Sequence, residues 1–171
     1  MNKITLLLLL SFSLGTAQNL GDPVAITGRT FGMKSIETKN INLNDAQIGQ
    51  LSTASKQKID TKLYRVFIAK NGSKVAGYGV LVNKKIRTKN AVTLYLITTD
   101  KKIKSIEIVA FNEPAEYLPS KTWLELFDNK SESNPLMLNQ DIPAKTGATL
   151  SARAITDGAR VALALLKITK L

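Results

Sequence analysis

The chain has 171 residues, of which 44% are hydrophobic and 22% charged, and its formal net charge is +11. This length fits one domain with a substantial core, and this composition excludes an intrinsically disordered chain. The sequence contains neither histidine nor cysteine, which excludes Cys/His zinc sites, disulfides, and Ser-His or Cys-His nucleophile pairs. No metal site and no catalytic side chain is therefore expected, and any chemistry should come from a bound organic cofactor.

Residues 1–17 have the layout of a secretory signal peptide. Lys3 precedes an apolar run over 4–14, and the small residues Gly15 and Ala17 occupy the two cleavage positions. The run is about half of the roughly 20 residues that a membrane span needs. We expect export across the inner membrane, cleavage after Ala17, and a single periplasmic or membrane-associated domain over 18–171. A retained anchor is the alternative.

The first half of the mature chain is expected to form a helix and a sheet. Residues 18–40 are mixed in composition and predict a leader with one short strand at most, and a helix over 44–58 follows, capped by Asn42 or Asn44. Stretches rich in β-branched and aromatic residues then predict strands over 62–70, 74–82, 91–99 and 103–111. Short turns join them, so the sheet should be antiparallel with at least one buried face.

The second half predicts two further helices. A short one is expected from Pro119 or Ser120, where four apolar residues recur at helical spacing: Trp123, Leu124, Leu126 and Phe127. Residues 128–145 are polar and interrupted by proline, which predicts a loop. The fold class that follows is α+β, with an antiparallel sheet of about four or more strands packed against two or three helices.

The last helix carries its charges on one narrow stripe and is apolar elsewhere, so it should be buried over most of its circumference. The stripe consists of Arg153, Asp157, Arg160 and Lys167. Arg153 and Asp157 are spaced to form an i,i+4 ion pair. Arg160 is expected to face solvent, so its removal should cost little stability.

The excess positive charge gathers at two places, 84–89 and 101–104, which should lie at opposite ends of the strand over 91–99. Neither cluster is interleaved with aromatic residues that could stack on bases, so no nucleic-acid partner is expected. A solvated basic surface is the simplest interpretation. Weak docking to an acidic redox partner and peripheral contact with anionic lipid are the alternatives.

The last helix is preceded by two hydroxyls and two small residues, Thr146-Gly147-Ala148-Thr149. A helix N-terminus exposes N–H groups, here including those of Leu150 and Ser151, and it attracts phosphate. Gly147 permits a tight turn and Ala148 adds little bulk. An ordinary threonine N-cap explains the same residues, and on these residues alone the cap is the favoured interpretation.

The segment "TGATLSARAIT" resembles the flavinylation motif of the FMN-binding domain family, which includes subunits of sodium-pumping NADH:quinone reductases and related electron-transport complexes. The family pattern is Asp-x-x-Ser/Thr-Gly-Ala-Thr. Two further segments are similar to the family: "GYGVLV" at 77–82 and "FNEPAEYLPSKTWLELF" at 111–127. The resemblance covers about 74–168. At the position of the motif aspartate this chain has Pro143, and Asp141 lies two residues earlier.

The resemblance implies that a dedicated flavin transferase esterifies Thr149 with the phosphate of FMN. It also implies that the segment containing Glu113, Tyr117 and Trp123 faces the flavin, although Trp123 alone reads more simply as a core residue of its helix. The departure at Pro143 bears on covalent attachment more than on flavin binding.

The function that this resemblance implies is an exported electron carrier, rather than a stand-alone enzyme, that relays electrons between a membrane reductase and an extracytoplasmic acceptor. One alternative is a flavin-dependent reductase subunit that acts on a substrate. The other is a binding domain of the same fold without a covalent flavin.

Overall fold

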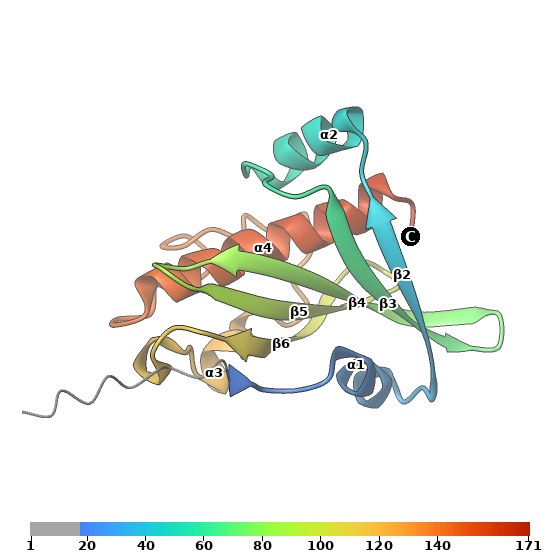
Figure 1. The fold of residues 1–171 in the computed structure, drawn as a ribbon, viewed down its shortest axis with the longest axis horizontal. Helices are drawn as coiled ribbons and strands as arrows, with labels where there is room; N and C mark the ends of the chain where they lie inside the picture. Colours follow the sequence, from blue (N-terminus) through green and yellow to red (C-terminus); the bar gives the residue numbers. More distant parts are fainter. Residues whose placement is uncertain (1–17) are drawn as a thin grey trace, which may run out of the picture.

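The computed structural model describes residues 18–171, so the predicted signal peptide lies outside the described residues (Figure 1). Its centre is a six-stranded antiparallel sheet in the order β1-β6-β5-β4-β3-β2. The strands are β1 (Gln18–Asn19), β2 (Ser35–Asn42), β3 (Leu63–Asn71), β4 (Lys74–Lys85), β5 (Asn90–Thr98) and β6 (Ile103–Phe111). The helices are α1 (Pro23–Phe31), α2 (Asp45–Ser55), α3 (Lys121–Leu124) and α4 (Thr149–Ile168), with short 3-10 helices η1 (Ala115–Tyr117) and η2 (Glu125–Phe127). The α+β fold class is confirmed.

The four strands predicted from local composition are all present, and β4 extends three residues beyond its predicted end. The hairpin predicted at Asn71-Gly72 is present between β3 and β4, but Asn71 pairs with Lys74, so the turn residues are Gly72, with a φ of 60°, and Ser73. The predicted helix over 44–58 is α2, and a capping box defines its start: Asn44 accepts from the Gln47 amide while Gln47 accepts from the Asn44 amide. Local sequence therefore specifies these elements.

The region 18–42 differs from its prediction, because it forms helix α1 and strand β2 in addition to the short β1. The Asp22 side chain caps the first amides of α1, Pro23 occupies the first turn, and Gly32 ends the helix with a φ of 66°. β2 pairs with β3 along its whole length but buries little of its own surface. Its mostly polar sequence explains why composition did not reveal it.

Two hydrophobic clusters lie on opposite faces of the sheet. The larger cluster packs α4 against one face, and α2 packs on α4 (Figure 1). The smaller one joins Ile26 of α1 to Phe67, Leu94, Leu96 and Val109 on the other face. α1 approaches β4 closely, since a Cβ at Gly77 would lie 2.1 Å from the Phe31 ring and one at Gly79 would lie 2.5 Å from Thr27 Oγ1. The two glycines of "GYG" therefore make room for α1.

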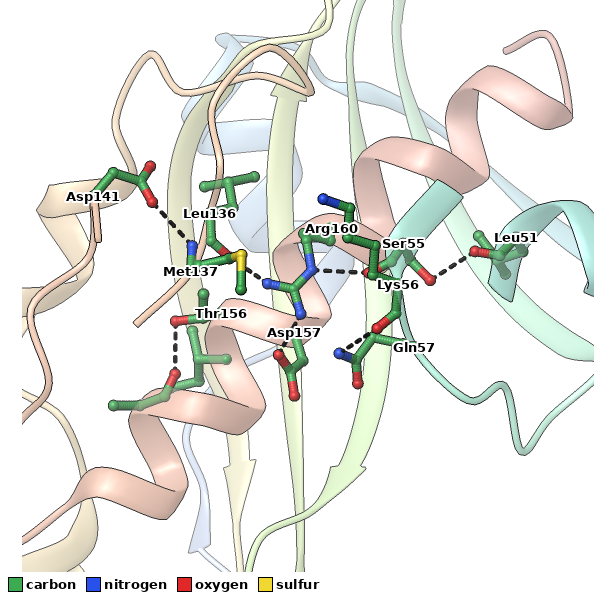
Figure 2. A network of polar contacts seen from close by, with 12 residues as sticks. Leu51, Ser55, Lys56, Gln57, Leu136, Met137, Asp141, Thr156, Asp157 and Arg160 are labelled. Carbon is green, nitrogen blue, oxygen red and sulfur yellow. Dashed lines mark hydrogen bonds and ion pairs between the residues drawn. The ribbon is translucent and has the colours of Figure 1, made fainter. Parts of the chain in front are cut away.

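α4 is buried over most of its circumference, as predicted, but its charged stripe is used differently. Figure 2 shows Arg160 turned into the protein, where Nε donates to Ser55 O at 2.8 Å, Nη1 donates to Leu136 O, and Nη2 pairs with Asp157 at 2.6 Å. The expectation that Arg160 faces solvent is therefore wrong, and Asp157 pairs with Arg160 rather than Arg153. Arg160 connects the end of α2, the 128–145 loop and α4.

A search of residues 18–171 finds no helix that is both long and apolar enough to cross a membrane.

Candidate functional site

The first turn of α4 lacks the usual capping partners. Ala148 is the N-cap residue and its side chain cannot accept a hydrogen bond. The first bond of the helix runs from the Ala152 amide to Ala148 O, and within residues 18–171 the amides of Thr149, Leu150 and Ser151 have no acceptor. Gly147 turns the chain into the helix with a φ of 79°, a conformation that disfavours other residues. The turn therefore presents three N–H groups and the positive end of a 20-residue helix dipole to any ligand.

A cavity of about 260 Å³ lies at this turn. It is lined by residues 147–151, at the start of α4, and by Ile86, Arg87 and Tyr117. Ser151 is 1% exposed, and its Oγ has no hydrogen-bond partner in the described part of the chain. A buried polar atom without a partner is unusual in a folded protein and indicates a missing ligand or water. The cavity thus combines unsatisfied backbone and side-chain groups.

Thr149 is exposed at the mouth of this cavity, and its Oγ1 donates only a long 3.3 Å bond to Lys145 O. Its hydroxyl is therefore accessible for modification. Thr146 is also exposed but lies just outside the lining residues. Of the residues predicted for the site, the structure brings together Gly147, Ala148, Thr149, Leu150, Ser151 and Tyr117.

Glu113 does not line the cavity but holds one of its walls. It is 9% exposed, and its Oε1 accepts the amides of Arg87, Thr88 and Lys89 at 3.0, 2.7 and 2.8 Å, at the tip of the β4–β5 hairpin. The Lys89 amide above all, with the other two amides and the Arg87 charge, keeps the pKa of this carboxyl below its ordinary value despite the opposing effect of burial. Glu113 is therefore an ionised anchor for the hairpin tip.

The hairpin tip carries Arg87 to the cavity wall, where its guanidinium stacks over the Tyr117 ring at 4.9 Å from the centroid. No hydrogen bond or ion pair of this guanidinium occurs within residues 18–171. Arg87 and Ile86 were missed as site residues, because the cluster 84–89 was interpreted as solvated surface charge. The two basic clusters do lie at opposite ends of β5, as expected, since Lys85 pairs with Asn90 at one end and the 99–102 turn closes the other.

Trp123 belongs to the core rather than to the cavity lining. It is 6% exposed, contacts Phe127 edge-to-face at 5.3 Å, and donates Nε1–H to Pro143 O at 2.9 Å. Its contribution to the site is indirect, because the last bond holds the loop that leads into Thr146–Thr149. Asp141, the acid nearest to the motif, accepts from the Met137 amide at 2.9 Å and pairs with Lys130 at 3.2 Å. It is therefore engaged within its own loop.

The arrangement is a small α+β domain with a cavity at the start of its last helix, where several hydrogen-bond donors have no partner among residues 18–171. Residues 87–164 match the model of the FMN-binding domain family, and this match runs from Arg87 through the cavity to the buried part of α4. This part of the chain is therefore an FMN-binding domain, and FMN is the cofactor indicated. No curated protein matches the chain.

The residues at the cavity fit a flavin phosphate. Three amides without acceptors, a buried hydroxyl without a partner and an arginine with unused donors all suit an anionic group with several acceptor oxygens. When bound, FMN supplies one- and two-electron redox chemistry that no side chain of this protein provides.

Proposed function

We propose that this protein is an exported electron carrier whose FMN is linked by a phosphoester to Thr149. The observation that carries the proposal is the exposed Thr149 hydroxyl at the mouth of a cavity with unsatisfied hydrogen-bond donors, inside the part of the chain that matches the FMN-binding domain. A flavin transferase would install the group. The donor would be a flavin dinucleotide: an Oγ1–P bond forms, the phosphoanhydride bond of the donor breaks, a nucleoside monophosphate leaves with the electron pair of that bond, and the Thr149 Oγ1–H proton passes to the leaving phosphate or to solvent.

The exposure of Thr149 supports electron relay over substrate turnover, because a flavin attached there borders solvent. The adjoining cavity measures about 260 Å³. It can take the phosphate and part of the flavin, and the remainder would stay accessible at the surface. An accessible ring suits direct electron exchange with a membrane reductase and an extracytoplasmic acceptor. A covalent link would also prevent loss of the cofactor outside the cytoplasm.

A noncovalent flavin is the second candidate, and one observation favours it. Pro143 stands where the family motif has aspartate, and Asp141 is occupied by Met137 and Lys130. Burial alone would raise the pKa of Asp141, but hydrogen bonds from the Met137 and Leu136 amides and from Lys130, together with the Lys130 charge, lower it. An acid so engaged is a poor substitute for the motif aspartate. In this case the transferase would not recognise the acceptor segment, while the cavity would keep its affinity for FMN.

The test is expression with the flavin transferase of the native host, followed by intact mass and visible absorption after denaturation. Wild type should gain the mass of one esterified FMN and stay yellow in denaturant. Thr149→Ala should lose both properties completely, and Thr146→Ala should reduce modification without removing it. Covalent flavin on the Thr149→Ala protein would refute the assignment. A wild type that binds FMN but never retains it in denaturant would establish the noncovalent candidate.

A further inference from the structure

We propose that Arg87 binds the phosphate of the flavin together with the first turn of α4, and that Glu113 is the positioning residue that holds Arg87 at the cavity. This inference rests on the proposed FMN site at Thr149. It adds a second wall to that site, built from a hairpin about 60 residues away in the chain.

The first step is the position of the hairpin tip. A β-hairpin tip is usually mobile, because its central amides face solvent. Here the amides of Arg87, Thr88 and Lys89 all converge on one oxygen of Glu113, a carboxylate that is 9% exposed. Hydrogen bonds to a charged acceptor are stronger than those between neutral groups. The tip is thereby fixed to the segment after β6, which also carries Tyr117.

The Arg87 guanidinium lies over the Tyr117 ring, and its hydrogen-bond donors have no acceptor among residues 18–171. Stacking on a ring holds the plane of the guanidinium while leaving its N–H edges available. These edges belong to a residue that lines the same small cavity as Thr149. A phosphate at Thr149 is thus within the cavity that Arg87 borders, and bidentate contact is the preferred mode for such a pair.

The first turn of α4 supplies further hydrogen-bond donors at the cavity. Among residues 18–171, the amides of Thr149, Leu150 and Ser151 have no acceptors, and the buried Ser151 Oγ has no partner. One anion between the two walls would satisfy the helix amides and the Ser151 hydroxyl, and would neutralise the Arg87 charge. Lys89 is exposed, as Arg87 is, but it does not line the cavity, although its amide also binds Glu113.

The experiment compares FMN with riboflavin, which lacks the phosphate, by equilibrium titration of protein produced without a flavin transferase. Arg87→Gln should weaken FMN binding by about tenfold or more and leave riboflavin binding unchanged. Arg87→Lys should restore part of the loss. Lys89→Gln, which removes the same charge from the same hairpin, should have little effect on either ligand. An equal loss for Arg87→Gln and Lys89→Gln, or an equal loss for both ligands in Arg87→Gln, would overturn the role of Arg87.

The role of Glu113 has its own readout in the flavin-free protein. Glu113→Ala should speed amide hydrogen exchange at Arg87, Thr88 and Lys89, and Glu113→Gln, which keeps one acceptor oxygen, should do so less. Both variants should also lose FMN affinity in the same order. Unchanged exchange in a folded Glu113→Ala protein would refute the positioning role. If wild type neither binds FMN nor becomes covalently flavinylated, the proposed function and the role of Arg87 both fail. If wild type binds FMN and Arg87→Gln does not change this binding, only the role of Arg87 is refuted.

Discussion

The two parts of α4 treat their polar groups in opposite ways. In its middle, Tyr95 donates its hydroxyl to Ile155 O at 2.8 Å, and Thr156 donates to Ala152 O at 2.8 Å. Arg160 binds acceptors on three different segments (Figure 2). In its first turn, three amides have no acceptor among the described residues, and the buried Ser151 hydroxyl has no partner there.

This difference separates what holds the fold from what receives the ligand. Leaving a buried polar group without a partner costs about 1–3 kcal/mol, and a stable protein tolerates this cost at only a few places. Among the described residues of α4 the one such side-chain group is Ser151 Oγ, at the end of the helix that borders the cavity. Substitutions in the middle of the helix should therefore lower the stability of the fold, whereas substitutions in the first turn should lower the affinity for flavin.

The largest expected effect on stability is at Arg160. Arg160→Ala leaves Ser55 O, Leu136 O and Asp157 without their partner, and its side chain is only 12% exposed. The free energy of unfolding should fall by about 2–4 kcal/mol, measured by urea denaturation. Arg153→Ala is the matched control, since Arg153 is exposed on the same helix, and it should change stability by less than about 0.5 kcal/mol. Equal effects at both positions would mean that Arg160 does not connect the three segments.

A smaller loss is expected at Gly158, where α4 contacts Tyr95. A Cβ at Gly158 would lie 2.2 Å from Tyr95 Oη, so Gly158→Ala should destabilise the fold by about 1–3 kcal/mol although alanine favours helices. Gly49 in α2 provides the control, because nothing lies within 4 Å of its Cβ position. Gly49→Ala should raise the midpoint of thermal unfolding. A stabilised Gly158→Ala protein would show that Tyr95 moves aside at no cost.

Local patterns predicted the elements whose residues carry the pattern themselves. β3 to β6 are rich in β-branched and aromatic residues, α2 carries a complete capping box, and α4 is apolar around most of its circumference. β2 is polar along most of its length and is a strand because β3 offers it an edge. α1 contains β-branched residues and an internal glycine, which weaken helix propensity, so only its caps at Asp22 and Gly32 could have revealed it.

The site followed the same division. The stretch 146–149 could be recognised because its residues are consecutive, and α4 begins at Thr149 with Ala148, rather than a threonine, as its N-cap. Arg87 could not be recognised, because the role proposed for it depends on Glu113 and Tyr117. These two residues follow β6 in the chain, and they meet the β4–β5 hairpin only in the folded sheet. Arg160 is a second residue whose surroundings are set by distant segments. Its position on a charged stripe predicted a solvent-exposed side chain, but α2 and the loop after α3 pack over it and bury it.

A third prediction concerns pH and the other wall of the cavity. The pKa of Glu113 is lower in the folded protein than its ordinary value of 4.5 in the unfolded chain. The ionised carboxylate therefore contributes fully to stability above pH 4.5, and this contribution is lost as the pH falls through the lower folded-state pKa. The amide proton shifts of Arg87, Thr88 and Lys89, followed by NMR from pH 7 to pH 3, should change together below 4.5 in wild type. In Glu113→Gln they should stay flat. A common inflection at or above 4.5 would contradict the ionised anchor.

The smallest effect tests the comparison most directly, because it uses the same substitution at two buried serines. Ser55 Oγ donates to Leu51 O at 2.6 Å, whereas Ser151 Oγ has no partner within residues 18–171. Ser55→Ala should therefore lower the free energy of unfolding by about 1 kcal/mol, and Ser151→Ala should leave the flavin-free protein equally stable or up to about 1 kcal/mol more stable. The same Ser151→Ala change should weaken FMN binding, because it removes a hydroxyl that is proposed to form a hydrogen bond with the flavin phosphate. Chemical denaturation and FMN titration of both variants measure the two effects. A Ser151→Ala protein that loses stability as Ser55→Ala does, with unchanged FMN affinity, would show that the first turn of α4 is held by its own contacts and is not kept open for a ligand.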